Sequence, residues 1–229
     1  MRISDKTIMA LVVVLATVMV LQTVVFVLVV GTASPVPTGR ATASSAQGSV
    51  GFTFVRTGIC AVPLTQGWTL ISLCANATDT SIATLLSGIN YRYVMRWNVS
   101  NQSFDIFSPR AASPPFTTLE YNTSYFINLN SASASMQIPG VNVSDINVSL
   151  GSGWNGPGFP YNLTTNITLY FNTTTHRYLM KWNASAQEFI VYSPRAELPA
   201  FTLISGGEGQ MLNAYQDDIL RYNRTFLES

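Results

Sequence analysis

Few side chains in this chain are suited to catalysis. His176 is the only histidine, and Asp217 and Asp218 are the only two acids that are neighbours in the sequence. Neighbouring residues of a strand point to opposite faces, which is poor geometry for an acid and a base that act on one substrate. A structural or exposed role is the simpler interpretation of His176, because no nucleophile accompanies it. We therefore predict that the protein is not an enzyme, with no catalytic residues and no cofactor.

A glycine-rich segment, Gly151–Gly156, matches the G-x-G-x-x-G pattern of dinucleotide-binding loops. That chemistry needs a helix to begin at the loop, so that its first amide groups face the phosphate. In this chain Pro157, Pro160 and an alternating strand pattern follow instead. A glycine turn that leads into a core tryptophan, Trp154, explains the match better, and we predict no nucleotide site.

Cys60 and Cys74 are the only cysteines. In an oxidising compartment two cysteines form one unambiguous disulfide. The segment between them has the pattern of two short strands around a turn, so the bond is expected to close a hairpin; a buried pair of free thiols is the alternative. We predict no metal site, because two cysteines and one distant histidine do not complete a tetrahedral ligand set.

These residues belong to a chain that repeats itself at a spacing of 85 residues. The matched segments are 93–98 with 178–183, 104–111 with 189–196, 116–117 with 201–202, 125–128 with 210–213 and, after a slip of one residue, 67–68 with 153–154. Matches of this density predict two copies of one module, a first copy at residues 51–137 and a second copy at residues 138–229.

Each copy shows the two-residue period of β-strands. One face is expected to carry Tyr91, Tyr93, Met95 and Trp97 and the other Arg92, Val94 and Arg96, with His176, Tyr178, Met180 and Trp182 against Arg177, Leu179 and Lys181 in the second copy. A six-residue polar link after each of these strands predicts a hairpin, which a Ser-Pro pair ends because proline cannot donate to the ladder. We predict one small β-sandwich per copy and no helix between residues 51 and 210, while the tail, residues 214–227, forms a short helix or a last strand.

Two sets of side chains recur in both copies and are candidates for binding: the tryptophans Trp68, Trp97, Trp154 and Trp182, and the basic pairs Arg92/Arg96 and Arg177/Lys181. The tryptophans could form platforms for sugars, but their equivalent places on apolar faces favour core packing. The basic pairs could dock an acidic partner. A solvated strand face is the simpler interpretation, since exposed charge pairs contribute little.

The chain begins with an apolar segment of 23 residues, Ile8–Val30. A helix of that length reaches about 34 Å, enough to cross a bilayer core of about 30 Å. Arg2 and Lys6 precede the segment and no basic residue follows it before Arg40, which favours an inner N-terminus and an outer remainder, residues 31–229. A cleaved secretory signal would also export the chain, but its apolar core is usually shorter.

We therefore predict an all-β protein with an N-terminal single transmembrane helix, followed by two tandem β-sandwich-like repeats. The tip and anchor are residues 1–30, and residues 31–50 have the Pro-, Ser- and Thr-rich composition of a stalk. Lys, Arg, Asp and Glu make up only 10% of the chain. Beyond residue 30 the charges balance, and no basic patch predicts nucleic acid as a partner.

Sugars linked to asparagine are expected to hydrate this weakly charged surface. Ser and Thr make up about a fifth of the chain, so about three Asn-X-Ser/Thr triplets are expected among 16 asparagines. There are 11, at Asn76, Asn98, Asn101, Asn122, Asn142, Asn147, Asn162, Asn166, Asn172, Asn183 and Asn223. Turn preference of Asn, Ser and Thr explains part of the excess, and dense N-linked glycosylation is the interpretation that we favour.

The succession of Gly-Trp, Tyr-x-x-x-Trp-Asn, Ser-Pro and Tyr-Phe-Ile-Asn resembles a β-module of exported prokaryotic, mainly archaeal, envelope or archaeal virion surface proteins. The second copy departs from it, with Gln210-Met211 in place of Tyr125-Phe126, which implies a looser last strand. The resemblance implies a structural role in an envelope or virion.

We expect a membrane-anchored, non-enzymatic glycoprotein that builds an exposed layer, spike or tail assembly. Its partners are expected to be the lipid bilayer, bound through Ile8–Val30, and copies of itself or other envelope or virion proteins. Two alternatives stay open: a pilin-like filament subunit, and an adhesin or carbohydrate-binding module.

Overall fold

A computed structural model of the chain describes residues 57–171 and 174–227. The predicted membrane span Ile8–Val30 and the stalk lie outside these ranges, as does Asn172. No helix within them is long and apolar enough to cross a membrane. The described residues belong to one compact unit, Phe52–Ser229, which contains segments of both copies.

Strands form most of the regular structure, and the all-β prediction is confirmed. In chain order the elements are β1 (Thr57–Ser72), β2 (Asn76–Ala77), α2 (Ile82–Leu85), β3 (Tyr91–Asn98), β4 (Ser103–Phe107), β5 (Ser124–Val141), β6 (Ile146–Leu150), β7 (Gly153–Asn155), β8 (Thr164–Asn166), α3 (Thr168–Phe171), β9 (His176–Asn183), β10 (Glu188–Tyr192), β11 (Leu203–Ser205), β12 (Gln210–Ala214), β13 (Asp218–Tyr222) and α4 (Arg224–Leu227). The expectation of no helix between residues 51 and 210 is wrong at α2 and α3, which are single turns. The tail holds both a strand, β13, and a short helix, α4.

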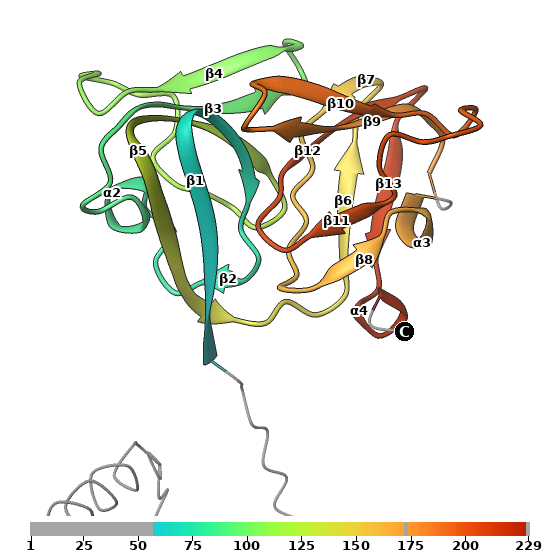
Figure 1. Cartoon of the computed structure of the whole chain (residues 1–229), viewed down its shortest axis with the longest axis horizontal. Coiled ribbons are helices and arrows are strands. Elements are labelled where there is room, and N and C mark those ends of the chain that lie inside the picture. The colour runs from blue at the N-terminus through green and yellow to red at the C-terminus, as the bar shows by residue number, and fades with distance from the viewer. Residues whose placement is uncertain (1–56, 172–173, 228–229) are drawn as a thin grey trace, which may run out of the picture. The chain divides into compact units, whose positions relative to one another are not determined.

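Two larger sheets have the same strand order. One runs β1-β5-β3-β4, with β2 on β5, and the other runs β7-β12-β9-β10. Their ladders correspond, since Trp68 pairs with Asn128 in the first sheet and Trp154 with Asn213 in the second. Two short ladders, β6 with β13 and β8 with β11, complete the body. The hairpins β3–β4 and β9–β10 lie at one end of the body, opposite the end at which β1 begins (Figure 1).

The disulfide Cys60–Cys74 is confirmed, but it does not close a hairpin. Both cysteines are buried, with their Cα atoms 6.0 Å apart. The segment between them is mostly the single strand β1, and all of its ladder partners lie on β5. The register shifts between Thr65 and Gly67, where Gly67 has a φ of +83°, and such a bulge bends a strand. The bend explains how Cys74, just beyond the end of β1, comes close to Cys60.

The first half of β5 is buried on both of its faces. Tyr125 and Ile127 pack in the core of the first copy, with Val94 and Leu64. Phe126, between them in the sequence, points to the opposite face and is only 5% exposed. A strand with both faces covered needs a second layer, and residues of the second copy supply it.

The predicted alternation fails at the start of β3 and of β9. The β3–β5 register skips Arg92, and the β9–β12 register skips Arg177, so each arginine is the extra residue of a β-bulge. A bulge reverses the facing of the residues before it. Tyr91 therefore packs against the first core instead of sharing the face of Tyr93.

The core of the second copy is rich in tyrosines. Burial raises the pKa of Tyr170 and Tyr222 well above the ordinary value, and raises that of Tyr161 to about 12, so these phenols stay neutral. Gln210, which replaces Tyr125 of the first copy, is fully buried. Its amide oxygen accepts from the Tyr170 hydroxyl at 3.1 Å, and its amide nitrogen donates to the Tyr222 hydroxyl at 2.7 Å.

We expect the double variant Cys60→Ala/Cys74→Ala to lower the free energy of unfolding by about 3 kcal/mol, because the bond restricts a loop of this size in the unfolded chain. For a chain of this length the melting temperature should fall by about 6–12 °C. Thermal unfolding of the full chain in detergent measures the shift. A reductant should destabilise the parent protein similarly and leave the variant unchanged; an equal response of both would contradict the prediction.

Candidate functional site

The two copies meet in an aromatic seam, which is the most distinctive side-chain cluster of the body. Its buried centre is Leu70, Phe126 and Met211, and around it pack Trp68, Met95, Trp97, Phe104, Trp154, Met180 and Trp182. The rings meet edge to face, as for Phe126 with Trp182 at a centroid distance of 5.3 Å. Such pairs add about 0.5–1.5 kcal/mol each beyond the burial of their area.

Tryptophan hydrogen bonds cross the seam in both directions. The indole nitrogen of Trp97 donates to the carbonyl oxygen of Trp154 at 2.7 Å, and that of Trp182 donates to the carbonyl oxygen of Trp68 at 2.8 Å. The two bonds join residues 57 and 114 positions apart. Each copy therefore supplies both the donor and the acceptor of an equivalent contact.

Two glutamines at the hairpin tips form further hydrogen bonds with the backbone of the same tryptophans, Trp154 and Trp68. The side chain of Gln102 accepts from the Trp154 amide at 2.9 Å and donates to its carbonyl oxygen at 3.1 Å. Gln187 makes the same pair of bonds to Trp68, at 2.8 and 2.9 Å. Both glutamines have a positive φ, 48° and 55°, which L-residues rarely adopt. A positive φ costs conformational free energy, and a residue keeps it where the surrounding contacts hold it in that conformation.

Backbone hydrogen bonds also join the two copies. They run from the Ser72 amide to Gly207 at 3.0 Å, from Gly158 to Asn122 at 2.8 Å, from Gly209 to Leu70 at 3.1 Å and from Ser124 to Gly156 at 2.7 Å. The first two are equivalent at the repeat spacing, and so are the last two. A Cβ atom on Gly209 would lie 2.5 Å from the Ile71 carbonyl oxygen, so this approach requires glycine.

The structure places the four tryptophans between the core packing that we predicted and the open sugar platform that was the alternative. All four tryptophans pack on apolar faces, but they do so in the seam and not inside either core, and each is half-buried. Sequence analysis missed Gln102 and Gln187. The signal was present, because both copies place glutamine four residues after an Asn that begins a glycosylation triplet.

The glycine-rich segment serves the seam. Gly153 begins β7, and its φ of +93° and a clash of any Cβ with the Gln102 side chain explain the glycine. The strand β7, and not a helix, follows from it. Asn155 fixes the turn, since its amide nitrogen donates to the carbonyl oxygens of Gly151 and Gly153.

The candidate titratable groups Asp217, Asp218 and His176 all have structural contacts. Asp217 accepts from the Ser152 amide, and Asp218 from the Thr175 amide, which with a second bond from Ile219 lowers the pKa of Asp218. The His176 ring packs 4.6 Å from the Phe171 ring, and burial lowers its pKa. No three metal-binding side chains are grouped anywhere in residues 57–171 or 174–227.

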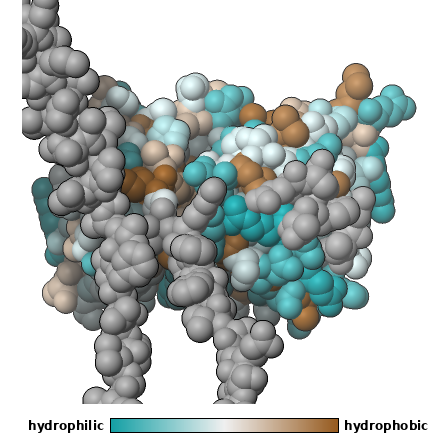
Figure 2. All heavy atoms as spheres, turned by 90° about the horizontal axis from the view of Figure 1, so that it is seen from below, coloured by the Kyte–Doolittle hydropathy of each residue, from teal (hydrophilic) through white to brown (hydrophobic). Residues whose placement is uncertain are grey.

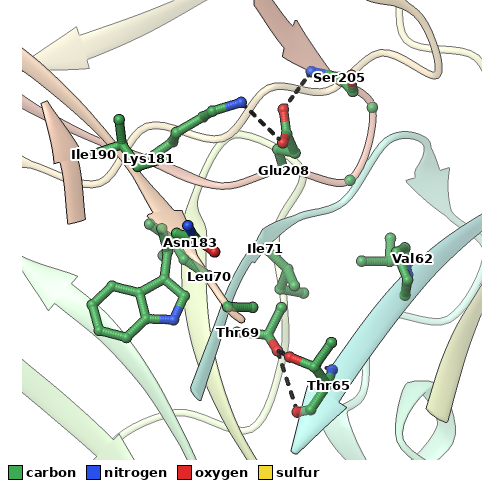
Figure 3. A pocket seen from close by; sticks show the side chains of 15 residues that line it. Val62, Thr65, Thr69, Leu70, Ile71, Lys181, Asn183, Ile190, Ser205 and Glu208 are labelled. Carbon is green, nitrogen blue, oxygen red and sulfur yellow. Dashed lines mark hydrogen bonds and ion pairs between the residues drawn. The ribbon is translucent and has the colours of Figure 1, made fainter. Parts of the chain in front are cut away.

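A crevice of about 560 Å³ opens where β1 passes the β9–β10 hairpin. Its walls include Thr65 and Thr69 on one side and Lys181 and Glu208 on the other (Figure 3). The Lys181 ammonium lies 3.3 Å from Glu208, whose second oxygen accepts from the Ser205 amide. Trp182 lines the crevice as well. The charges here are paired with one another, so the crevice suits a neutral ligand better than an ion.

An equivalent crevice of about 290 Å³ lies on the other side of the seam, lined by Trp97, Val148 and Asn155. Two asparagines of the predicted glycosylation triplets, Asn122 and Asn147, also line it. At the matching positions of the larger crevice the chain has Gly207 and Ala61. Asn183, which also begins a triplet, lines the larger crevice, so sugars on these asparagines would lie beside both crevices.

Comparison of the chain with protein-family models, with curated proteins and with solved structures found no match.

We expect Gln102→Ala and Gln187→Ala each to lower the free energy of unfolding by about 1 kcal/mol, because each leaves a backbone amide of the seam without its side-chain acceptor and removes one of the two donors to the adjacent carbonyl. Equivalent contacts should give losses of similar size. Urea unfolding of the full chain in detergent, followed by tryptophan fluorescence, measures them. Gln137, an exposed glutamine on β5, provides the matched control Gln137→Ala, and an equal loss in the control would contradict the role of the seam.

His176 should make stability depend on pH. Its pKa is lower in the folded state than in the unfolded chain, so unfolding takes up a proton. The stabilisation is complete above the unfolded pKa of about 6.5 and is lost as the pH falls through the folded pKa. Melting temperatures between pH 8 and 5 test this. His176→Tyr, which installs the residue of the first copy, should flatten the dependence, and an unchanged slope would refute it.

Proposed function

We propose that the protein is a non-enzymatic structural glycoprotein displayed on the outer surface of a membrane, in an envelope or enveloped virion of archaeal type. In this proposal residues 1–30 are the anchor, residues 31–50 the stalk, and the two β-modules at 51–137 and 138–229 the exposed head. Neighbouring copies or other envelope proteins complete the layer, spike or tail. The tight union of the two modules supports a mechanical role, because a body joined by reciprocal contacts transmits load as one piece.

The exposure of the asparagines carries the proposal. Among the described residues, the triplet asparagines that lie exposed are Asn76, Asn101, Asn142, Asn147, Asn162, Asn166 and Asn223, and those that are half-buried are Asn98, Asn122 and Asn183. Asn155, which is 1% exposed, begins no triplet. A glycan needs an accessible side chain, so this distribution is the one that glycosylation requires.

The surface supports the same proposal. On the face seen in Figure 2, hydrophobic side chains form small areas among hydrophilic and neutral ones. The hairpins that carry Asn98, Asn101 and Asn183 lie at the end of the body opposite the start of β1 (Figure 1). Sugars on these hairpins would hydrate the end farthest from the point where the chain enters the body.

A carbohydrate-binding surface module is the second candidate. It is favoured by the half-exposure of the four tryptophans and by the crevice that Trp182 lines, since aromatic side chains with few polar groups beside them are typical of ligand pockets.

Intact-mass measurement tests the leading proposal. Protein isolated from its native membrane should be heavier than the bare chain of 25.0 kDa and should approach that mass after deglycosylation. Asn147→Gln should remove the mass of one glycan, whereas Asn90→Gln, at an exposed asparagine outside any triplet, should remove none. A native mass equal to that of the bare chain would refute the proposal.

A further inference from the structure

A polar groove of about 740 Å³ lies beside β3, apart from the seam crevices. Its lining includes Arg92 and Tyr93 of β3, the turn that ends in Arg110, and the side chains of Asn90 and Asn130. Tyr93 is 44% exposed. Asn130 donates its amide to the Asn90 side-chain oxygen at 3.0 Å, which leaves the Asn90 amide as a donor and the Asn130 oxygen as an acceptor.

The two arginines of this groove have no counter-ion in the described part of the chain. Arg96, on the same strand, forms an ion pair with Asp105 at 3.2 Å. Among the described residues, Arg96 is thus paired, while Arg92 and Arg110 have no ion pair. In a protein with so few charges, these two guanidinium groups give the groove a positive charge that no ion pair among the described residues offsets.

The second copy keeps the same residues. Arg177, Tyr178 and Arg195 stand at the equivalent positions, and Tyr178 is 45% exposed. The backbone that presents them is also the same: Arg92 and Arg177 each occupy a β-bulge, and the turns begin with Ser108 and Ser193, whose hydroxyls accept from the Arg110 and Arg195 amides.

Packing does not explain this retention, because the side chains are exposed. Elsewhere the copies have diverged, and even the buried Tyr125 has become Gln210. The tryptophans and glutamines are the same in both copies because both copies use them to form the seam. None of the exposed arginines and tyrosines contacts the seam, and only Arg177 has a ring contact, with Tyr215, so a function outside the body is the reason that we infer. Bulges commonly direct a side chain toward a site.

We propose that the groove of Arg92, Arg110 and Tyr93 binds an acidic saccharide. The guanidinium groups would bind its carboxylate or sulfate oxygens, for which their planar geometry is suited. The Tyr93 ring offers a face for a sugar ring, and the Asn90–Asn130 pair offers a donor and an acceptor for hydroxyl groups. In the second copy Tyr215 stands in place of Asn130, and Arg177 lies 4.7 Å from its ring, so that site lacks the amide pair. We expect it to bind more weakly.

This inference goes beyond the structural role proposed above and does not depend on the membrane anchor or on the glycans of the chain. Calorimetric titration of the full chain tests it, in a polyoxyethylene detergent that carries no sugar head group. The probes are a heparin-derived hexasaccharide for sulfate, trigalacturonate for carboxylate, and maltotriose as the neutral control. The acidic probes should bind and weaken with added salt. Maltotriose that binds as tightly would overturn the proposal, and so would the failure of both acidic probes.

Variants locate the site. Arg92→Gln/Arg110→Gln should weaken the acidic probe at least tenfold, and Arg177→Gln/Arg195→Gln should have a smaller effect. Arg221→Gln, at an exposed arginine of β13, is the matched control and should change affinity less than twofold. Equal weakening by the control would show nonspecific attraction and would overturn the proposal. Melting curves confirm that each variant is folded.

Two further arms identify the ligand. Pentaglutamate that binds as tightly as the acidic sugars would replace the saccharide by an acidic peptide and overturn the assignment. Glycans released from the protein itself, if they bind and lose affinity in Arg92→Gln/Arg110→Gln, make neighbouring copies the source. If they do not bind while trigalacturonate or the hexasaccharide does, another surface is the source.

Discussion

The reciprocal contact between Trp97 and Trp154, and between Trp182 and Trp68, is the constraint on which the body depends. Each indole donates to a backbone carbonyl in the other copy, and each glutamine tip then satisfies the same residue. Neither copy completes these bonds by itself. The seam also covers Phe126, whose strand would otherwise present an apolar face to water. The seam is therefore part of the folding core of both copies, and the two copies form one unit.

The two copies use equivalent residues in the seam but differ in the residues around it. Four backbone hydrogen bonds between the copies start at equivalent positions. The first copy has Ser72 and Ser124 at these positions, and the second copy has Gly158 and Gly209. The serine hydroxyls bond to the partner's backbone, as Ser124 does with Pro157 at 2.7 Å, while the glycines permit the approach. The flanking crevices have diverged further, because only the larger one contains the ion pair of Lys181 and Glu208. A shared framework thus supports two different surfaces.

The sequence was sufficient for the hairpins β3–β4 and β9–β10 and for the pairing of the two cysteines, and insufficient for the seam. Local alternation marked β3 and β9, because one face of each strand meets a core. The 85-residue spacing indicated that the copies share their own internal contacts. It carried no information about contacts between them, since Trp68 and Gln187 are linked only through the fold. The bulges at Arg92 and Arg177 were missed because an unpaired residue leaves no mark on composition. The same limit applied to β1, which an alternation pattern divides at Gly67 although the strand continues through the bend.

The reciprocal joint has a consequence for the order in which the chain becomes stable. The contacts that complete the first copy come from residues 154–158, 182–187 and 207–211, so most of the chain has to be made before the first copy is finished. Pairings this distant in sequence are slow to form, and the uncovered aromatic face is prone to aggregate in the meantime. A chain threaded across a membrane from its N-terminal side would emerge with that face open. If the chain is glycosylated as we propose, early attachment of sugars to the first copy would shield that face during this interval and would give the triplet asparagines a use in biogenesis.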